Sequence, residues 1–99
     1  MLDFDHLSRQ TLGDRALERR ILELFLAQSD VLIARLRSAG DPREVAHTIN
    51  GSARAIGAFD LASIATRIEA SEASIDNDID ELVAVFERTR TFVADHLGK

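Results

Sequence analysis

The chain is organised around residues 46–58, which read AHTINGSARAIGA. On a helical wheel with about 100° per residue, the apolar side chains of this stretch and of the turn before it gather on one side. These side chains are Val45, Ile49 and Ile56, with Ser52 among them. His47 lies on the opposite side of the wheel, so we expect one amphipathic helix that carries an exposed histidine.

Amphipathic helices are also predicted on both sides of this stretch, because apolar residues recur there at three- and four-residue spacing. The predicted helices span about residues 14–38, 42–56, 60–75 and 78–97, after a short helix within residues 2–10. The predicted N-caps are Asp14, Asp41 and Asp60, and the predicted helix ends are Gly40 and Gly57. Residues 76–78 read Asp-Asn-Asp, which predicts a polar turn.

The apolar stripes of these helices predict the core. The expected core residues are Leu17, Ile21, Leu24, Phe25, Val31, Leu32 and Leu36 in the first long helix, Leu61, Ile64, Ala65, Ile68 and Ile75 in the third, and Ile79, Leu82, Val83, Phe86, Val93 and Leu97 in the last. Because the connections are short, consecutive helices must pack as antiparallel neighbours. The sequence therefore predicts an all-α fold, an antiparallel up-down four-helix bundle with a short extra N-terminal helix.

Composition favours a single soluble domain over residues 1–99. The 99 residues are 45% hydrophobic and 29% charged, a balance typical of globular chains. The chain has no cysteine, no apolar run near the roughly 18 residues of a membrane span, and no signal-peptide pattern. Its formal net charge of −5 disfavours a nucleic-acid-binding surface. We therefore expect a cytoplasmic protein that binds neither nucleic acid nor membranes.

His47 has the chemistry to carry a phosphoryl group. Imidazole is nucleophilic when neutral, and an ordinary histidine is largely neutral near neutral pH. Gly51 lies one turn later on the same face, where glycine costs about 1 kcal/mol relative to alanine but leaves the histidine accessible. Arg43 and Arg54 lie on the same stripe; they are either counter-charges for a phosphoryl group or ordinary solvated arginines.

This pattern resembles the histidine-containing phosphotransfer (HPt) domain family, in which a phosphorylatable histidine lies on the second helix of a four-helix bundle. Gly51, Gly57, Leu61 and Glu69 follow His47 at the family's spacings of four, ten, fourteen and twenty-two residues. Asn50 departs from the pattern, since the family commonly has lysine there. An asparagine can hydrogen-bond a phosphoryl oxygen but brings no charge, so we expect weaker phosphate stabilisation or a shift of that role to Arg54.

The resemblance implies a phosphocarrier rather than an enzyme. Such a domain takes a phosphoryl group from the aspartyl phosphate of a response-regulator receiver domain and passes it to another receiver, in a relay that includes a hybrid histidine kinase. The resemblance also implies that Glu69 hydrogen-bonds Nδ1 of His47 and leaves Nε2 as the nucleophile. No cofactor or metal is expected on this chain, because the Mg²⁺ site belongs to the receiver.

The resemblance further implies where the receiver docks. An apolar patch is expected around the histidine, at the end of the bundle nearer the short first helix, with Leu7, Leu12 and Ala58 as candidate partner-binding residues. We expect the chain itself to be a monomer.

The same residues also allow other interpretations. A bundle of this shape could dock a receiver or kinase without carrying phosphate, and the Asn50 departure keeps that reading open. A helical dimerisation domain would need more apolar residues on exposed faces, for which Leu26 and Ile33 are the nearest candidates. A di-iron site is disfavoured, because the Glu44-x-x-His47 pattern occurs once and such sites need two copies.

Overall fold

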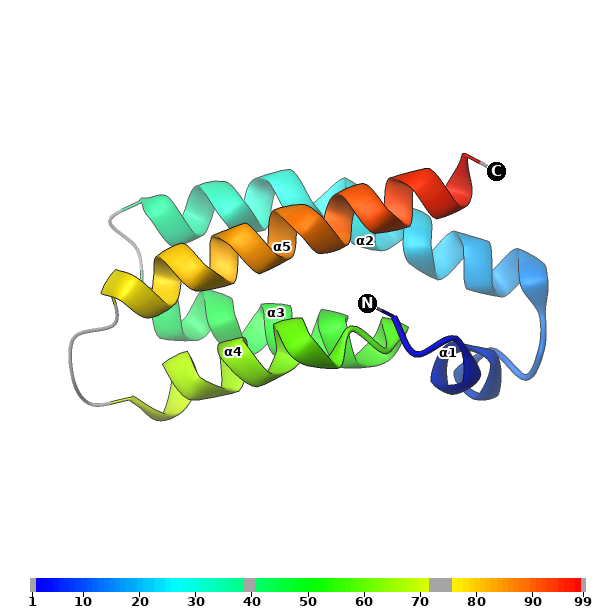
Figure 1. Ribbon diagram of the computed structural model, residues 1–99, viewed down its shortest axis with the longest axis horizontal. Helices are drawn as coiled ribbons and strands as arrows, with labels where there is room; N and C mark the ends of the chain where they lie inside the picture. Colours follow the sequence, from blue (N-terminus) through cyan, green and yellow to red (C-terminus); the bar gives the residue numbers. More distant parts are fainter. Residues whose placement is uncertain (1, 39–40, 72–75, 99) are drawn as a thin grey trace.

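The computed structural model describes residues 2–38, 41–71 and 76–98, which form five helices and no strand. The helices are α1 (Phe4–Gln10), α2 (Arg15–Arg37), α3 (Pro42–Ile56), α4 (Phe59–Ala70) and α5 (Asp76–Leu97). Their arrangement, shown in Figure 1, confirms the predicted all-α bundle with a short extra N-terminal helix.

Acidic N-caps begin α2 and α3 as predicted. Asp14 accepts a hydrogen bond of 3.1 Å from the backbone N–H of Leu17, and Asp41 accepts one of 3.0 Å from the backbone N–H of Arg43. Each carboxylate satisfies a backbone donor that has no partner inside the helix. The start of the histidine-bearing helix is therefore fixed by its own local sequence.

The predicted start of α4 was wrong by one residue. The helix begins at Phe59, and the N-cap position is held by Ala58, whose side chain makes no capping hydrogen bond. Asp60 lies inside the first turn instead, where its negative charge interacts favourably with the helix dipole. The preceding left-handed turn at Gly57, rather than a polar cap, sets where this helix starts.

The predicted boundary between the last two helices also differs from the structure. α4 ends at Ala70, and residues 72–75, including Ile75, lie outside the described residues, as does Gly40. The polar segment 76–78 is the first turn of α5 rather than a separate turn. Acidic residues are favourable in the first turn of a helix for the same electrostatic reason as at an N-cap.

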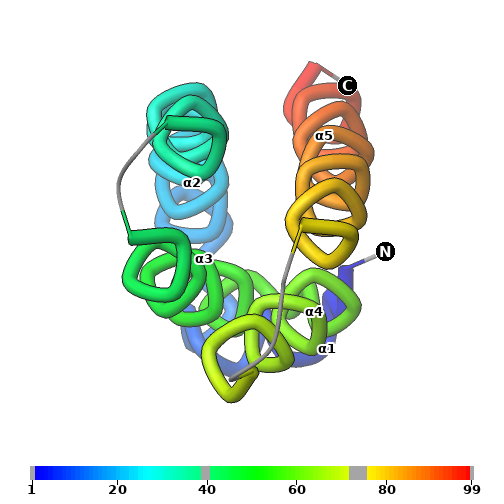
Figure 2. Tube along the Cα trace, turned by 90° about the vertical axis from the view of Figure 1, so that its left-hand side faces the viewer, coloured from blue at the N-terminus to red at the C-terminus, as the bar shows by residue number. Residues whose placement is uncertain are grey.

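The four long helices form an antiparallel ring. α2, α3, α4 and α5 alternate in direction, each packs on the next, and α5 closes the ring against α2. Figure 2 looks along the bundle, with α2 above α3 on one side and α5 above α4 on the other. Because α2 and α5 have 23 and 22 residues and α3 and α4 only 15 and 12, the longer pair extends past the shorter pair at one end. No helix in the described ranges is long and apolar enough to cross a bilayer.

The core confirms most of the predicted stripes, but α2 is rotated relative to the prediction. Its buried residues are Leu22, Phe25, Ser29, Leu32 and Leu36. Leu22 and Ser29 were not predicted to be buried. Leu17, Leu24 and Val31, which were predicted to be core residues, are 44%, 46% and 60% exposed. The error has a physical reason: α2 carries two apolar stripes, and the sequence alone does not say which one faces the other helices.

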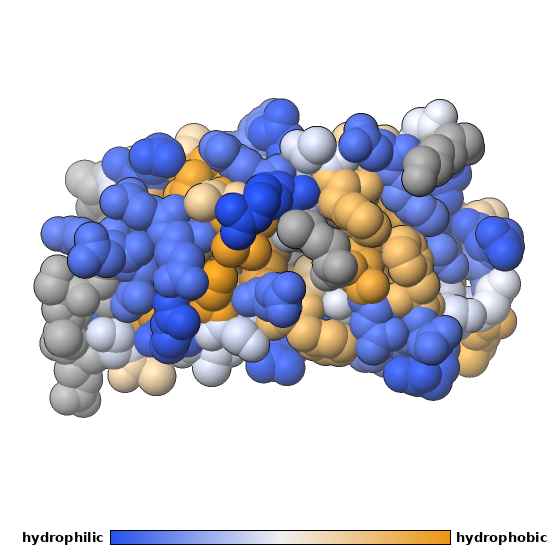
Figure 3. Space-filling view, in the orientation of Figure 1, coloured by the Kyte–Doolittle hydropathy of each residue, from blue (hydrophilic) through white to orange (hydrophobic). Residues whose placement is uncertain are grey.

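α1 fills the end of the bundle where α2 and α5 extend past the shorter helices. Leu7 is fully buried there, and the ring of Phe4 packs against Phe92 and His96 of α5, with centroids 6.2 and 4.9 Å apart. Figure 3 shows apolar side chains gathered where α1 approaches α5. α1 is thus a cap on the core, not a free N-terminal extension.

Gly57 joins this cap to the turn between α3 and α4. Its φ is +78°, in the left-handed region, and a Cβ atom there would lie 2.7 Å from the backbone oxygen of Asp3. The backbone N–H of Asp3 donates to the Gly57 carbonyl at 2.9 Å. Both the turn and the close approach of the N-terminal chain therefore require a residue without a side chain.

Candidate functional site

His47 lies in the middle of α3 and points into solvent. Its side chain is 80% exposed, because Val45, Ala46, Ile49 and Ala53 turn the apolar side of the helix into the core. The outward direction of this histidine was predicted from the helical wheel, and the structure confirms it. An imidazole in this position can be reached by a large partner.

Glu69 of α4 orients the ring. Its Oε2 atom lies 3.3 Å from Nδ1 of His47, and its side chain is only 26% exposed. Because an ionised carboxylate only accepts hydrogen bonds, a bond at this distance has Nδ1–H as the donor. The lone pair of the ring is then on Nε2. The predicted contact between Glu69 and Nδ1 is present.

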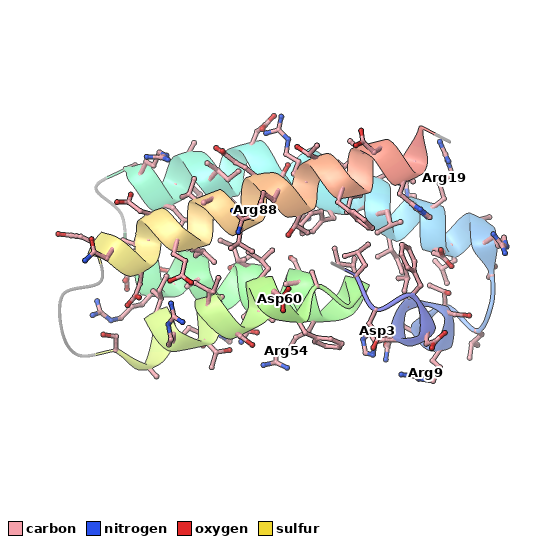
Figure 4. All side chains as sticks on the ribbon, in the orientation of Figure 1. Asp3, Arg9, Arg19, Arg54, Asp60 and Arg88 are labelled. Carbon is pink, nitrogen blue, oxygen red and sulfur yellow. The ribbon has the colours of Figure 1, made fainter. Side chains whose placement is uncertain are left out.

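Asn50 and Arg54 extend this contact along α3. The Nδ2 atom of Asn50 donates to Oε1 of Glu69 at 3.3 Å, and its Oδ1 atom accepts from Nε of Arg54 at 2.8 Å. In Figure 4 the Arg54 side chain projects away from the bundle, on the side of the α3–α4 layer opposite α2 and α5. The four side chains form one hydrogen-bonded chain, from His47 through Glu69 and Asn50 to Arg54.

Arg43 lies one turn before His47 and is partly buried. Its Nε atom donates to the backbone oxygen of Ser71 at 2.9 Å. This bond ties the start of α3 to the C-terminal end of α4. Arg43 therefore has a structural contact in addition to its place near the histidine.

Gly51 leaves the space beside His47 open. A Cβ atom built on Gly51 meets no other atom within 4 Å in the described part of the chain. Close helix packing was the alternative explanation for a glycine in mid-helix, and this open space excludes it. The open space leaves room for a partner to approach His47 past Gly51.

Two of the three predicted partner-binding residues are buried. Leu7 is 0% exposed and Ala58 is 1% exposed, so neither side chain can contact a docked protein. Leu7 closes the core under α1. Ala58 does not lie on the face predicted from the helical wheel, because α3 ends at Ile56 and the left-handed turn at Gly57 redirects the chain. Leu12 is 94% exposed, and it lies in the turn after α1 with a left-handed φ of 53°, which is uncommon for a residue with a side chain.

An apolar surface beside the histidine was missed at the sequence level. It is a groove between α2 and α3, and we call it the α2–α3 groove. Its lining residues include Leu24, Gln28 and Val31 from α2 and Thr48, Ser52 and Ala55 from α3. The signal that could have found it is the seven-residue repeat of Leu17, Leu24 and Val31, which marks a second apolar stripe on α2. Thr48 directly follows His47, so this groove adjoins the site.

The described residues contain no group of three or more histidine, cysteine, aspartate or glutamate side chains arranged to hold a metal ion. His6 and His96 serve other contacts: Nε2 of His6 lies 2.8 Å from the Arg54 carbonyl oxygen, and His96 packs on Phe4. The chemistry available at the site is therefore that of an exposed, oriented imidazole with a carboxylate, an amide and arginines around it.

Comparison with known proteins agrees with this picture. The family model described as Hpt domain matches residues 20–92, which include all of α3 and α4. Neither the curated proteins nor the solved structures gave a match.

Proposed function

Since the chain belongs to the Hpt domain family, the phosphotransfer modules of two-component signalling, we propose that His47 accepts a phosphoryl group from one receiver-domain aspartate and passes it to another. The observation that carries this proposal is the orientation of the ring. His47 is exposed and its Nδ1 atom faces Glu69, so that Nε2 is left free toward solvent. An exposed, oriented nucleophile without a pocket of its own suits a carrier that a partner enzyme must approach.

The proposed transfer balances without any further reagent. The lone pair of Nε2 attacks the phosphorus of the aspartyl phosphate, the N–P bond forms, and the P–O bond to the aspartate breaks. The receiver carboxylate leaves with the bonding electron pair. The proton on Nδ1 stays on the ring, and the Glu69 carboxylate offsets the positive charge that develops there. The reverse step delivers the group to a second receiver, which supplies the Mg²⁺ that this chemistry uses.

Arg54 is the counter-charge that we propose for the phosphoryl group. It lies two turns after His47 on the same face of α3 and is exposed. A phosphoryl group adds about two negative charges, which arginine binds well through paired N–H groups. Arg43 supplies charge from the other side while it keeps its bond to Ser71.

We propose the α2–α3 groove as the docking surface for the receiver, in place of the predicted patch near α1. A receiver has to bring its aspartyl phosphate to Nε2 of His47, and the groove is lined by Thr48, the residue that follows His47 in α3. On the helical wheel Gly51 lies between His47 and this groove. Because glycine has no side chain, a receiver docked in the groove meets no obstruction there on the way to the imidazole.

The test of the carrier function is phosphoryl transfer from a labelled receiver to the wild-type chain and to His47→Ala. Label that is acid-labile and base-stable, as expected of a phosphoramidate, should appear on the wild type alone. Label on both proteins would contradict the assignment to His47. Receivers that bind the wild type but leave it unlabelled would favour the docking module without phosphate.

The docking surface is tested by binding of an unphosphorylated receiver to Val31→Glu. Val31 is 60% exposed, so the variant should fold normally and bind at least tenfold more weakly, since a charge at the centre of an apolar contact is costly. Thr91→Glu, an exposed position on α5, is the matched control and should bind as the wild type does. Leu12→Asn examines the end near α1; if it weakens binding more than Val31→Glu, our choice of surface is wrong.

A further inference from the structure

The position of Asn50 in the hydrogen-bonded chain requires a side chain that both donates and accepts hydrogen bonds. On one side it faces Oε1 of Glu69, which only accepts hydrogen bonds, and on the other it faces Nε of Arg54, which only donates. A residue that joins the two must donate with one atom and accept with another. An amide side chain does both, whereas a lysine can only donate and an aspartate can only accept.

We propose that Asn50 is a positioning residue that holds the Glu69 carboxylate so that Oε2 faces Nδ1 of His47. This inference rests on the proposed function and extends it to the residue that departs from the family pattern. Asn50 fixes one carboxylate oxygen at 3.3 Å, and the other is then directed at the imidazole, also at 3.3 Å. Asn50 does not touch the phosphoryl group in this assignment; it acts through Glu69.

Arg54 fixes the orientation of the amide. It lies four residues after Asn50 on the same helix and donates to Oδ1 at 2.8 Å. With the amide oxygen taken by a cation, only the Nδ2 group can face Glu69. If the amide turned over, its oxygen would face the carboxylate and its NH₂ group would face the guanidinium, so both contacts would become repulsive. The partial burial of Asn50 and Glu69 strengthens the preference, because water competes less there.

The neutrality of the amide distinguishes it from the lysine that is common in the family. A lysine at position 50 would pair with Glu69 as a cation and compete with His47 for the same carboxylate. Arg54 would also lose a hydrogen-bond acceptor, because a lysine has no oxygen to replace Oδ1 of Asn50. Asparagine holds Glu69 without neutralising it, so the full negative charge stays available to the Nδ1–H group of His47.

The experiment is a measurement of the His47 tautomer by ¹⁵N chemical shifts in the unphosphorylated protein, together with the phosphoryl-transfer rate. The wild type should show His47 mainly with the proton on Nδ1. Asn50→Ala should lower that population and slow transfer by about tenfold, comparable to the loss of a group that orients a metal-bound histidine. Asn50→Lys should also lower the Nδ1–H population, despite its added charge.

Two further variants make the result decisive. In a Glu69→Ala background, Asn50→Ala should not change the tautomer, because Asn50 reaches the imidazole only through Glu69. Thr66→Ala, which removes a hydroxyl that donates to the Ala62 carbonyl within α4, is the matched control and should keep the wild-type signature.

The inference is overturned if Asn50→Ala keeps the wild-type tautomer, or if it shifts the tautomer equally with and without Glu69. Either result can occur while His47 is still phosphorylated, which would leave the carrier function intact. Conversely, label that persists on His47→Ala would refute the carrier assignment while the tautomer measurement stands.

Discussion

At the scale of single residues, stability and access conflict at Gly51. Glycine in the middle of a helix loses more backbone entropy on folding than any other residue. The structure offers no packing contact in return, since the space above Gly51 is open. The residue therefore weakens α3 beside His47, and substitutions at position 51 should separate the effect on stability from the effect on access to the imidazole.

We predict that Gly51→Ala raises the free energy of unfolding by about 1 kcal/mol, because alanine is the better helix former and its methyl group meets open space. Urea denaturation followed by circular dichroism measures this change. Gly51→Leu should also fold well but slow phosphoryl transfer by at least tenfold, because its side chain obstructs the approach to His47. A loss of stability in Gly51→Ala, or unchanged transfer in Gly51→Leu, would contradict the access explanation.

A substitution of Arg54 tests whether its positive charge stabilises the phosphoryl group on His47. We predict that Arg54→Gln shortens the lifetime of the phosphorylated protein or slows its formation, since the positive charge that offsets the phosphoryl group is lost while an uncharged polar side chain remains. Transfer rates at two salt concentrations provide the measurement, because screening should reduce the difference between wild type and variant. Arg19→Gln is the matched control, because Arg19 is an exposed arginine of α2 that lies away from the site.

At the scale of the elements, α2 shows which of its two stripes builds the bundle. Leu22 and Leu24 are two residues apart in one helix and carry the same side chain. Leu22 is 0% exposed in the core, and Leu24 is 46% exposed beside the α2–α3 groove. Packing against the neighbouring helices, rather than hydrophobicity, makes the difference between them.

We predict that Leu22→Ala lowers the free energy of unfolding by about 2–5 kcal/mol, because it leaves a cavity in the core. Leu24→Ala should cost less than about 1 kcal/mol and should weaken receiver binding instead. Denaturation curves of the two variants give the comparison directly. Equal losses of stability would mean that the outer stripe of α2 also packs in the folded protein.

The attachment of α1 depends on Gly57. We predict that Gly57→Ala lowers the free energy of unfolding by more than about 1–2 kcal/mol, the cost of a left-handed backbone for a residue with a side chain. The new methyl group would also lie too close to the backbone of Asp3. Hydrogen exchange should show faster exchange in α1. Gly98→Ala, where a Cβ atom has only ordinary contacts of 3.5 Å or more, is the control and should be nearly neutral.

At the scale of the whole molecule, the Cα trace measures 41 × 21 × 18 Å, and His47 is exposed on its surface rather than enclosed in a cleft. The exposed stripe of Leu17, Leu24 and Val31 is more apolar surface than the sequence suggested. The proposed receiver and a second copy of the chain are the two candidates to cover this stripe, and they differ in how the assembly depends on protein concentration.

We predict that the protein is a monomer of 10.9 kDa at tens of micromolar, because the stripe is narrow and its residues keep only about half of their surface exposed. Sedimentation velocity over a hundredfold range of concentration tests this. A dimer that Val31→Glu dissociates would show that the stripe joins two copies of the chain and would revive the dimerisation alternative.

Local sequence by itself determined the helices, most of their ends and the outward direction of His47. Capping by Asp14 and Asp41, the glycine after Ile56 and the apolar period are short-range effects that a few neighbouring residues control. The resemblance of residues 47–69 to the HPt pattern predicted the family and the contact between Glu69 and Nδ1 of His47, and both are present.

Only the tertiary structure decided which surfaces stay exposed. α2 has two apolar stripes, and the positions of α3 and α5 select the one that contains Leu22. The burial of Leu7 and Ala58 depends on α1 folding back onto the turn at Gly57, a contact between residues more than fifty positions apart. The amide bridge at Asn50 likewise needs α4 beside α3. These are long-range contacts, and a periodicity read along one helix carries no information about them.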